Sequence, residues 1–227
     1  MSLYLYGIGF WIFAIITILF KYNTALQDRF ALRVLIKIIP AALAVVFFLM
    51  FRNSDALFYF LFSLALAFCA LGDFGMEVNL LPGLGMFLIA HIVFTVNFII
   101  QSLMIGVTEV SLGAFGIVFI VMLIYILMFK RYLQTSEKET PKPMLQAVNV
   151  YALLISLTLS TSVLLWFASS IVLGYIPIVG AILFIISDTM IGIREFHHDF
   201  KYQNYLVYST YYLAIFLLSM SVLIYLF

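Results

Sequence analysis

Residues 144–187 read MLQAVNVYALLISLTLSTSVLLWFASSIVLGYIPIVGAILFIIS and contain no charged side chain. A membrane-spanning helix needs about 20 mostly apolar residues, so this run is too long for one span and long enough for two. The residues near its middle favour a turn between two helices: Ser169, Ser170, Gly174 and Pro177. The stretch therefore predicts a helical hairpin inside a bilayer.

The rest of the chain has a similar composition. Of its 227 residues, 66% are hydrophobic and only 9% are charged, whereas about 25% are charged in soluble domains. A water-soluble fold of this size would have to expose much of that apolar surface. The net charge of +1 gives no basic surface for nucleic acid, and the single cysteine, Cys69, excludes an intrachain disulfide.

Repeated apolar runs predict an all-α polytopic transmembrane helical bundle with about eight spans, which we treat as one integral membrane domain over residues 1–227. Lys37 lies inside the second run, and we expect its side chain to snorkel to the interface. Nothing in the sequence indicates an oligomeric state. The expected spans are 3–20, 34–51, 56–73, 82–102, 110–129, 147–167, 174–193 and 204–226.

The positive charges predict the orientation of this bundle. Every Lys and Arg except Arg52 falls in or beside the first, fifth or seventh loop, all on the same side of the membrane. Loops rich in Lys and Arg stay in the cytoplasm, so we expect both termini on the non-cytoplasmic side. The residues on the rich side are Lys21, Arg29, Arg33, Lys37, Lys130, Arg131, Lys138, Lys142, Arg194 and Lys201.

Two acidic residues fall within predicted spans rather than loops. Asp73 ends the third span and Asp188 lies inside the seventh, both in the cytoplasmic half. Burying a carboxylate in a membrane is costly, so such residues are functional candidates. His91 lies at similar depth in the fourth span, and we hypothesise that all three share one cavity. Alternatively, Asp73 caps a helix end and His91 makes a packing hydrogen bond.

The segments around these residues resemble the YhhN-like lysoplasmalogenase family of eight-span membrane proteins. A family Tyr is replaced by Phe94, and a Gln by Ile215. The segments that carry the resemblance are Leu71–Asp73, Phe87–Phe94, Tyr151, Gly180–Asp188 and Thr210–Ala214.

The resemblance implies an enzyme that hydrolyses the vinyl ether bond of lysoplasmalogens, single-chain lysophospholipids drawn from the membrane. Protonation of the enol ether carbon needs a general acid, and water needs a general base. We assign the acid role to Asp188, as the more buried residue, and the base role to Asp73, although coupled acids leave the reverse open. We expect substrate contacts from His91, Tyr151, Ser187, Tyr211 and Arg194.

This chemistry requires no metal or cofactor, and we interpret the segment Glu195–Asp199, with its two histidines, as structural rather than metal-binding. Two other functions stay open: a proton-coupled transporter of a small amphiphile, in which paired acids relay protons, and a zinc-dependent membrane lipid hydrolase that uses His91 with the aspartates. A non-enzymatic receptor is a further alternative. We expect the protein in a bacterial inner membrane rather than the endoplasmic reticulum.

Overall fold

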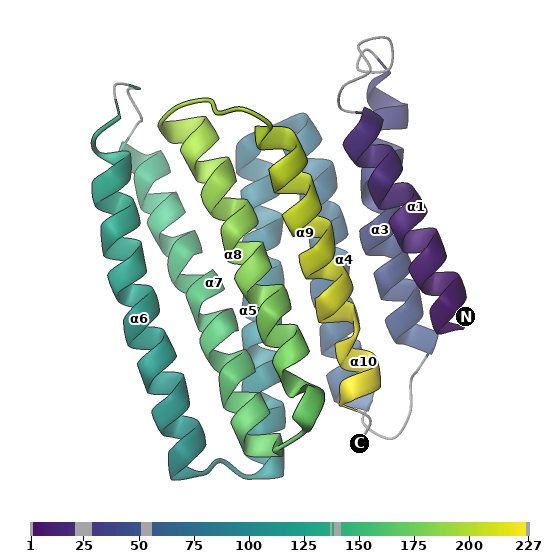
Figure 1. The fold of residues 1–227 in the computed structure, drawn as a ribbon, viewed down its shortest axis with the longest axis vertical. Helices are drawn as coiled ribbons and strands as arrows, with labels where there is room; N and C mark the ends of the chain where they lie inside the picture. The colour runs from purple at the N-terminus through teal and green to yellow at the C-terminus, as the bar shows by residue number, and fades with distance from the viewer. Residues whose placement is uncertain (1, 21–28, 51–55, 137, 139–141, 226–227) are drawn as a thin grey trace.

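The computed structural model describes residues 2–20, 29–50, 56–136, 138 and 142–225. Within these ranges the chain forms no strand, and its long helices run up and down along one axis (Figure 1). Two short helices, η1 (Val172–Gly174) and α10 (Ser221–Ile224), flank the last long ones. The long helices are α1 (Leu3–Phe20), α3 (Phe30–Met50), α4 (Ala56–Val78), α5 (Leu80–Ile105), α6 (Glu109–Leu133), α7 (Lys142–Ser169), α8 (Tyr175–Phe196) and α9 (Gln203–Ser219).

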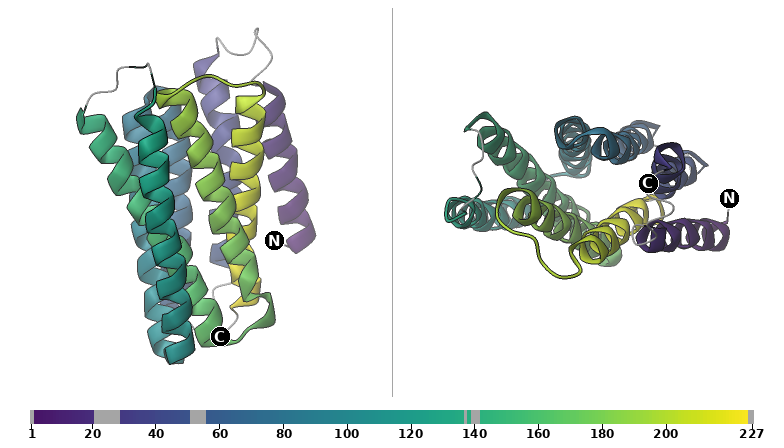
Figure 2. Two further views of the ribbon diagram at one scale, coloured as in Figure 1. Left: turned by 60° about the vertical axis from the view of Figure 1, so that its left-hand side comes forward. Right: turned by 90° about the horizontal axis from the view of Figure 1, so that it is seen from above.

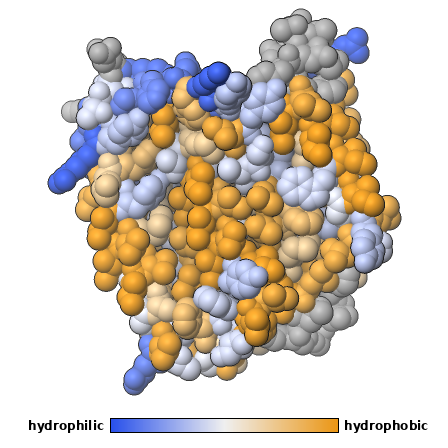
Figure 3. Space-filling view, viewed as in Figure 1, coloured by the Kyte–Doolittle hydropathy of each residue, from blue (hydrophilic) through white to orange (hydrophobic). Residues whose placement is uncertain are grey.

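These helices confirm the predicted all-α polytopic membrane bundle. Seven of the described helices are long and apolar enough to cross a membrane, and α1 is apolar but shorter. Apolar side chains cover the middle of the face in Figure 3, whereas hydrophilic residues gather at the end that carries the α6–α7 and α8–α9 loops. Both termini lie toward the opposite end (Figure 1). Which end faces the cytoplasm stays a prediction, and Lys21 and Arg52 lie outside the described residues.

The charge-free run forms the predicted hairpin. Helix α7 ends at Ser169, Ser170 adopts a left-handed backbone with φ of 54°, and η1 leads into α8. A side chain at Gly174 would place its Cβ 2.5 Å from the Trp166 ring. The turn therefore needs a glycine where it folds back against the end of α7.

Helix α4 is longer than predicted. It continues to Val78, so the prediction that Asp73 ends the span, and with it the helix-cap alternative, is wrong. The turn that follows is tight, because Asn79 caps α5 by accepting a hydrogen bond from the Leu81 amide at 3.2 Å. The extra turn of α4 carries Glu77, which forms ion pairs with Arg33 and Lys37 of α3.

Seven helices form a ring in which each packs against the next: α1, α3, α4, α5, α7, α8 and α9, with α9 returning to α1. Helix α6 packs against α7 at one edge of the bundle (Figure 2). The ring brings α4 and α8, which carry the two predicted intramembrane acids, around a common interior.

Aromatic rings fill the interior in the half that is distant from the lysine-rich loops. Phe48 and Phe62 stack with centroids 4.4 Å apart, and Phe94 packs edge-on against Phe62 at 4.9 Å. All three side chains are fully buried. The acidic residues Asp73 and Asp188 lie in the other half of the bundle, on the side of the lysine-rich loops.

The orientation is testable because Cys69 is fully buried and the wild-type chain should not react with a membrane-impermeant maleimide. A cysteine at Ser136, in the α6–α7 loop, should be protected in intact cells and labelled after permeabilisation, whereas one at Thr108, in the α5–α6 loop, should be labelled in intact cells. The reverse pattern would contradict the predicted orientation.

Candidate active site

Asp73 is an almost completely buried carboxylate on α4, with 2% of its surface exposed. The Tyr211 hydroxyl of α9 donates a hydrogen bond of 2.8 Å to its Oδ2 atom. A carboxylate without such a donor would be strongly destabilised in an apolar interior. The bond therefore both holds Asp73 in one orientation and joins α4 to α9.

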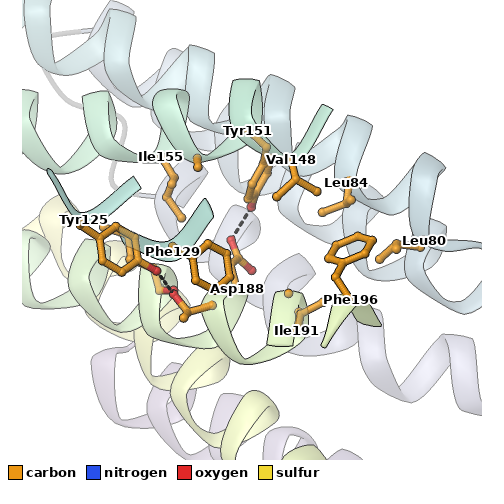
Figure 4. A pocket seen from close by; sticks show the side chains of 14 residues that line it. Leu80, Leu84, Tyr125, Phe129, Val148, Tyr151, Ile155, Asp188, Ile191 and Phe196 are labelled. Carbon is orange, nitrogen blue, oxygen red and sulfur yellow. Dashed lines mark hydrogen bonds between the residues drawn. The ribbon is translucent and has the colours of Figure 1, made fainter. Parts of the chain in front are cut away.

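Asp188 lies on α8 and has a tyrosine partner of its own. The Tyr151 hydroxyl of α7 donates a hydrogen bond to its Oδ2 atom (Figure 4). Asp188 is only partly buried, so the prediction that it is the more buried acid is wrong. The reason is that its side chain borders two cavities, whereas Asp73 is enclosed by helices.

Both aspartates line the first of these cavities, which we call the polar cavity. It contains about 380 Å³ of empty space between α3, α4, α5, α8 and α9, a volume that includes space open to the outside. The structure therefore places Asp73 and Asp188 together, as the acid-pair hypothesis requires, although their catalytic roles stay a prediction. The polar and charged residues that line the cavity are Lys37, Asp73, Ser187, Asp188, Arg194 and Tyr211, with Tyr208 beside them.

Lys37 does not snorkel to the interface, and that prediction is wrong. It is 5% exposed, and its Nζ atom lies 3.1 Å from Glu77 Oε1. Arg33 Nε lies 2.5 Å from the other Glu77 oxygen. Lys37 also interacts electrostatically with Asp73, so an ion network reaches the wall of the polar cavity.

Sequence reasoning missed this network, although the spacing carries a signal for it. Arg33 and Lys37 are four residues apart on α3, as are Asp73 and Glu77 on α4. Residues at that spacing lie on one face of a helix. Two cations on one helix and two acids on the next would therefore face each other if α3 packed against α4, which it does.

The second cavity, which we call the apolar cavity, lies on the other side of Asp188. It contains about 540 Å³ of empty space between α5, α6, α7 and α8, a volume that includes space open to the outside. Apolar side chains such as Leu84, Phe129 and Ile155 surround it (Figure 4). Asp188 and Ile191 line both cavities, so the two spaces meet at this face of α8.

His91 is not among the residues that line the polar cavity, although its ring packs edge-on against Tyr151, the partner of Asp188, with centroids 5.7 Å apart; its contact with substrate stays a prediction. It is 1% exposed, its Nδ1 atom lies 3.2 Å from Thr158 Oγ1, and Phe184 packs edge-on against its ring at 4.7 Å. The packing alternative describes these contacts better, because they join α5 to α7 and α8.

Two other predicted substrate contacts lie at the polar cavity. The Ser187 hydroxyl donates to the Val207 carbonyl at 3.1 Å, a bond that fixes α8 against α9. Arg194 lines the cavity, where its Nη1 atom donates to Asn204 Oδ1 at 3.1 Å and its Nη2 atom lies 2.8 Å from Glu195 Oε1. Whether either residue contacts substrate stays a prediction.

The described part of the chain contains no group of three or more His, Cys, Asp and Glu side chains placed to hold a metal ion. His197, in the segment that we interpret from the sequence as structural, stacks on Tyr132 with centroids 4.4 Å apart. Its Nε2 atom lies 3.1 Å from Thr135 Oγ1. These contacts tie the α8–α9 loop to the end of α6.

These features define a class: polytopic helical membrane proteins with a pair of carboxyl groups from two helices in one cavity toward one end of the bundle. The chain belongs to the YhhN family, whose model matches residues 32–222 and so includes both aspartates and both tyrosine partners. The predicted family resemblance is confirmed. No curated protein and no solved structure is significantly similar to the chain.

Replacing Lys37 by Met should lower the free energy of unfolding by roughly 3 kcal/mol, because removing one partner of a buried ion network leaves an uncompensated charge. Lys130→Met, at an exposed position on α6, should change it by less than about 0.5 kcal/mol. Denaturant titration in mixed micelles measures both. Equal stabilities of the two variants would show that Lys37 is not part of a stabilising network.

Proposed function

We propose that the protein hydrolyses the vinyl ether bond of lysoplasmalogens and releases a fatty aldehyde and a glycerophospho-base. The observation that carries this proposal is the pair of aspartates from α4 and α8 that line one cavity inside a membrane bundle. Membership of the YhhN family supports it, together with the predicted resemblance to lysoplasmalogenases.

Vinyl ether hydrolysis suits a carboxyl pair because its first step is a proton transfer to carbon. A general acid protonates the carbon distal to the ether oxygen, and the double bond becomes an oxocarbenium ion. A nearby carboxylate stabilises that cation, and the same carboxylate accepts a proton from the attacking water. The reaction therefore needs one protonated and one ionised carboxyl group at the same site.

The surroundings of the aspartates support Asp188 as the acid and Asp73 as the base, now for a different reason than burial. Lys37 offers Asp73 a positive charge, which suits an ionised group. Asp188 has the Tyr151 hydroxyl as its hydrogen-bond partner, and none of the ion pairs among the described residues includes it. Its position between the cavities also brings it closest to any molecule that occupies both.

In the proposed reaction, protons move between the two aspartates, one water molecule and the substrate. Asp188 gives its proton to the alkenyl carbon, water adds to the carbon that bears the ether oxygen, and the water proton passes to Asp73. The resulting hemiacetal then collapses: its hydroxyl proton returns to Asp188, the bond to the glycerol oxygen breaks, and Asp73 returns its proton to that oxygen. One water molecule is consumed, and both carboxyl groups regain their starting states.

Tyr151 and Tyr211 act in this proposal as positioning residues. Each donates to one carboxyl oxygen and leaves the second oxygen of that carboxyl group for substrate or water. A fixed rotamer matters because a general acid must lie within about 3 Å of the atom that it protonates.

A proton-coupled transporter is the second candidate, because paired intramembrane acids also relay protons. The packed rings of Phe48, Phe62 and Phe94 favour hydrolysis instead, since they fill part of the interior in the half of the bundle distant from the acids. Flux of a fluorescent amphiphile into proteoliposomes, without product formation, would support the transporter.

A zinc-dependent lipid hydrolase is tested by metal analysis of the purified protein and by loss of activity with a chelator.

We also propose that the substrate enters from the surrounding membrane and that the membrane is a bacterial inner membrane rather than the endoplasmic reticulum. With the predicted orientation, the polar cavity lies in the cytoplasmic half of the bilayer. Membrane fractionation of the native source tests the location.

Aldehyde release from lysoplasmenyl-ethanolamine should fall by about 10²–10⁴-fold in Asp188→Asn and in Asp73→Asn, the range that general acid or base groups contribute. Tyr151→Phe should lose less activity, because Asp188 is still present and lacks only the hydrogen bond that positions it. The purified wild type and variants are compared in detergent, with melting temperatures to confirm folding. If the wild type releases aldehyde from no vinyl ether lipid, the proposed enzyme activity is wrong. If the aspartate variants are fully active, the acid-pair mechanism is wrong.

Hydrolysis in D₂O should place one deuterium on the carbon next to the aldehyde carbonyl, because the mechanism starts with protonation of that carbon. Immediate reduction of the aldehyde to the alcohol prevents later exchange, and mass spectrometry counts the label. An alcohol that carries no deuterium at that carbon would show that the reaction includes no proton transfer to carbon.

A further inference from the structure

The two cavities differ in chemical character and share one wall. The polar cavity is lined by Lys37 and Arg194 as well as by the aspartates. The apolar cavity is surrounded almost entirely by hydrocarbon and aromatic side chains, with Asp188 at one side of it. The residues common to both, Asp188 and Ile191, are about one turn apart on α8.

We propose that the two cavities are the two arms of a single binding site for one single-chain phospholipid, with the hydrocarbon chain in the apolar cavity and the phosphate in the polar cavity. This proposal rests on the proposed function and deepens it. A lipid in this position would pass the side chain of Asp188 at the junction between its chain and its head group, which is where a vinyl ether bond lies.

The charges support this orientation of the lipid rather than the reverse. A phosphate needs cationic donors, and those that line the cavities, Lys37 and Arg194, belong to the polar arm. Arg194 is at the last turn of α8, toward the end of the bundle where hydrophilic residues gather (Figure 3). Its guanidinium group can therefore receive a phosphate from the interface, while the chain stays in apolar surroundings.

Gly192 lines the apolar arm at the point where α8 lies closest to Phe129 of α6. A Cβ atom on Gly192 would lie 2.9 Å from the ring of Phe129, so Gly192 lets α8 approach α6 while space for a chain is kept. Phe129, Ile155 and Phe196 line the same arm (Figure 4). A larger side chain at position 192 would occupy the place of the hydrocarbon chain, which makes Gly192 a specificity-determining residue.

Ile191 lies beside Asp188 at the junction, because both residues line both cavities. A bound lipid must pass beside it, so its rotamer determines how wide the passage at Asp188 is.

Binding of non-cleavable ligands tests the proposal apart from catalysis. The probes are 1-O-hexadecyl lysophosphoethanolamine, which lacks the vinyl double bond, and 1-O-hexadecylglycerol, which also lacks the phosphate. Gly192→Leu should weaken the binding of both by about fivefold or more, because it fills the apolar arm. Arg194→Gln should weaken the phosphate ligand by about tenfold and leave hexadecylglycerol unchanged, a loss typical of a charge-assisted hydrogen bond.

Matched controls lie on α6, outside both cavities. A Cβ atom on Gly113 would meet nothing within 4 Å, so Gly113→Leu should bind both probes as the wild type does. Arg131→Gln removes a cation at the same end of the bundle and should likewise have no effect. Melting temperatures confirm that each variant is folded.

The outcomes separate this proposal from the proposed function. If Gly192→Leu behaves as Gly113→Leu does, or if Arg194→Gln weakens both probes equally, the two-arm site is wrong. If the wild type binds neither probe, it is wrong as well. If the probes bind as expected but no vinyl ether lipid is cleaved, the site stands and the proposed hydrolysis falls.

Discussion

The structure depends on how it accommodates carboxyl groups inside an apolar bundle. An isolated carboxylate in such surroundings is strongly destabilised, so each must find donors or cations from neighbouring helices. Asp73 takes Tyr211 from α9, Asp188 takes Tyr151 from α7, and Glu77 takes Lys37 and Arg33 from α3. These polar contacts link α3, α4, α7, α8 and α9 around one interior, and they place the site in that interior.

The arrangement of helices explains why two acids so distant in the chain meet. Helix α4 packs against α3 and α5, and α8 packs in the same way against α7 and α9. The contact between α3 and α9 likewise has a counterpart between α7 and α5. If α1, α3, α4 and α5 are taken as one half and α6, α7, α8 and α9 as the other, Asp73 on α4 and Asp188 on α8 occupy corresponding helices. These two helices run in the same direction (Figure 1), and both acids line the same cavity.

The fold was predictable from the sequence because the membrane imposes a strong length and polarity constraint on each span. Apolar runs and the distribution of Lys and Arg were sufficient for the helices and their order. The site was only partly predictable. Asp73 and Asp188 stand out as acids among apolar residues, but the burial of Lys37 depends on Glu77 from another helix, and the position of His91 depends on Thr158 and Phe184. Such contacts depend on which helices touch, and hydropathy alone does not contain that information.

The proposed mechanism requires that the aspartate pair hold one proton at neutral pH and that this proton belong to Asp188. Infrared spectroscopy of the purified protein in membranes measures it directly, because a protonated carboxyl group has a carbonyl stretching band that a carboxylate lacks. We expect the wild type and Asp73→Asn to show this band, with its shift in D₂O, and Asp188→Asn to lose it. A wild-type spectrum without the band, or a band that disappears only in Asp73→Asn, would show that Asp188 does not hold the proton.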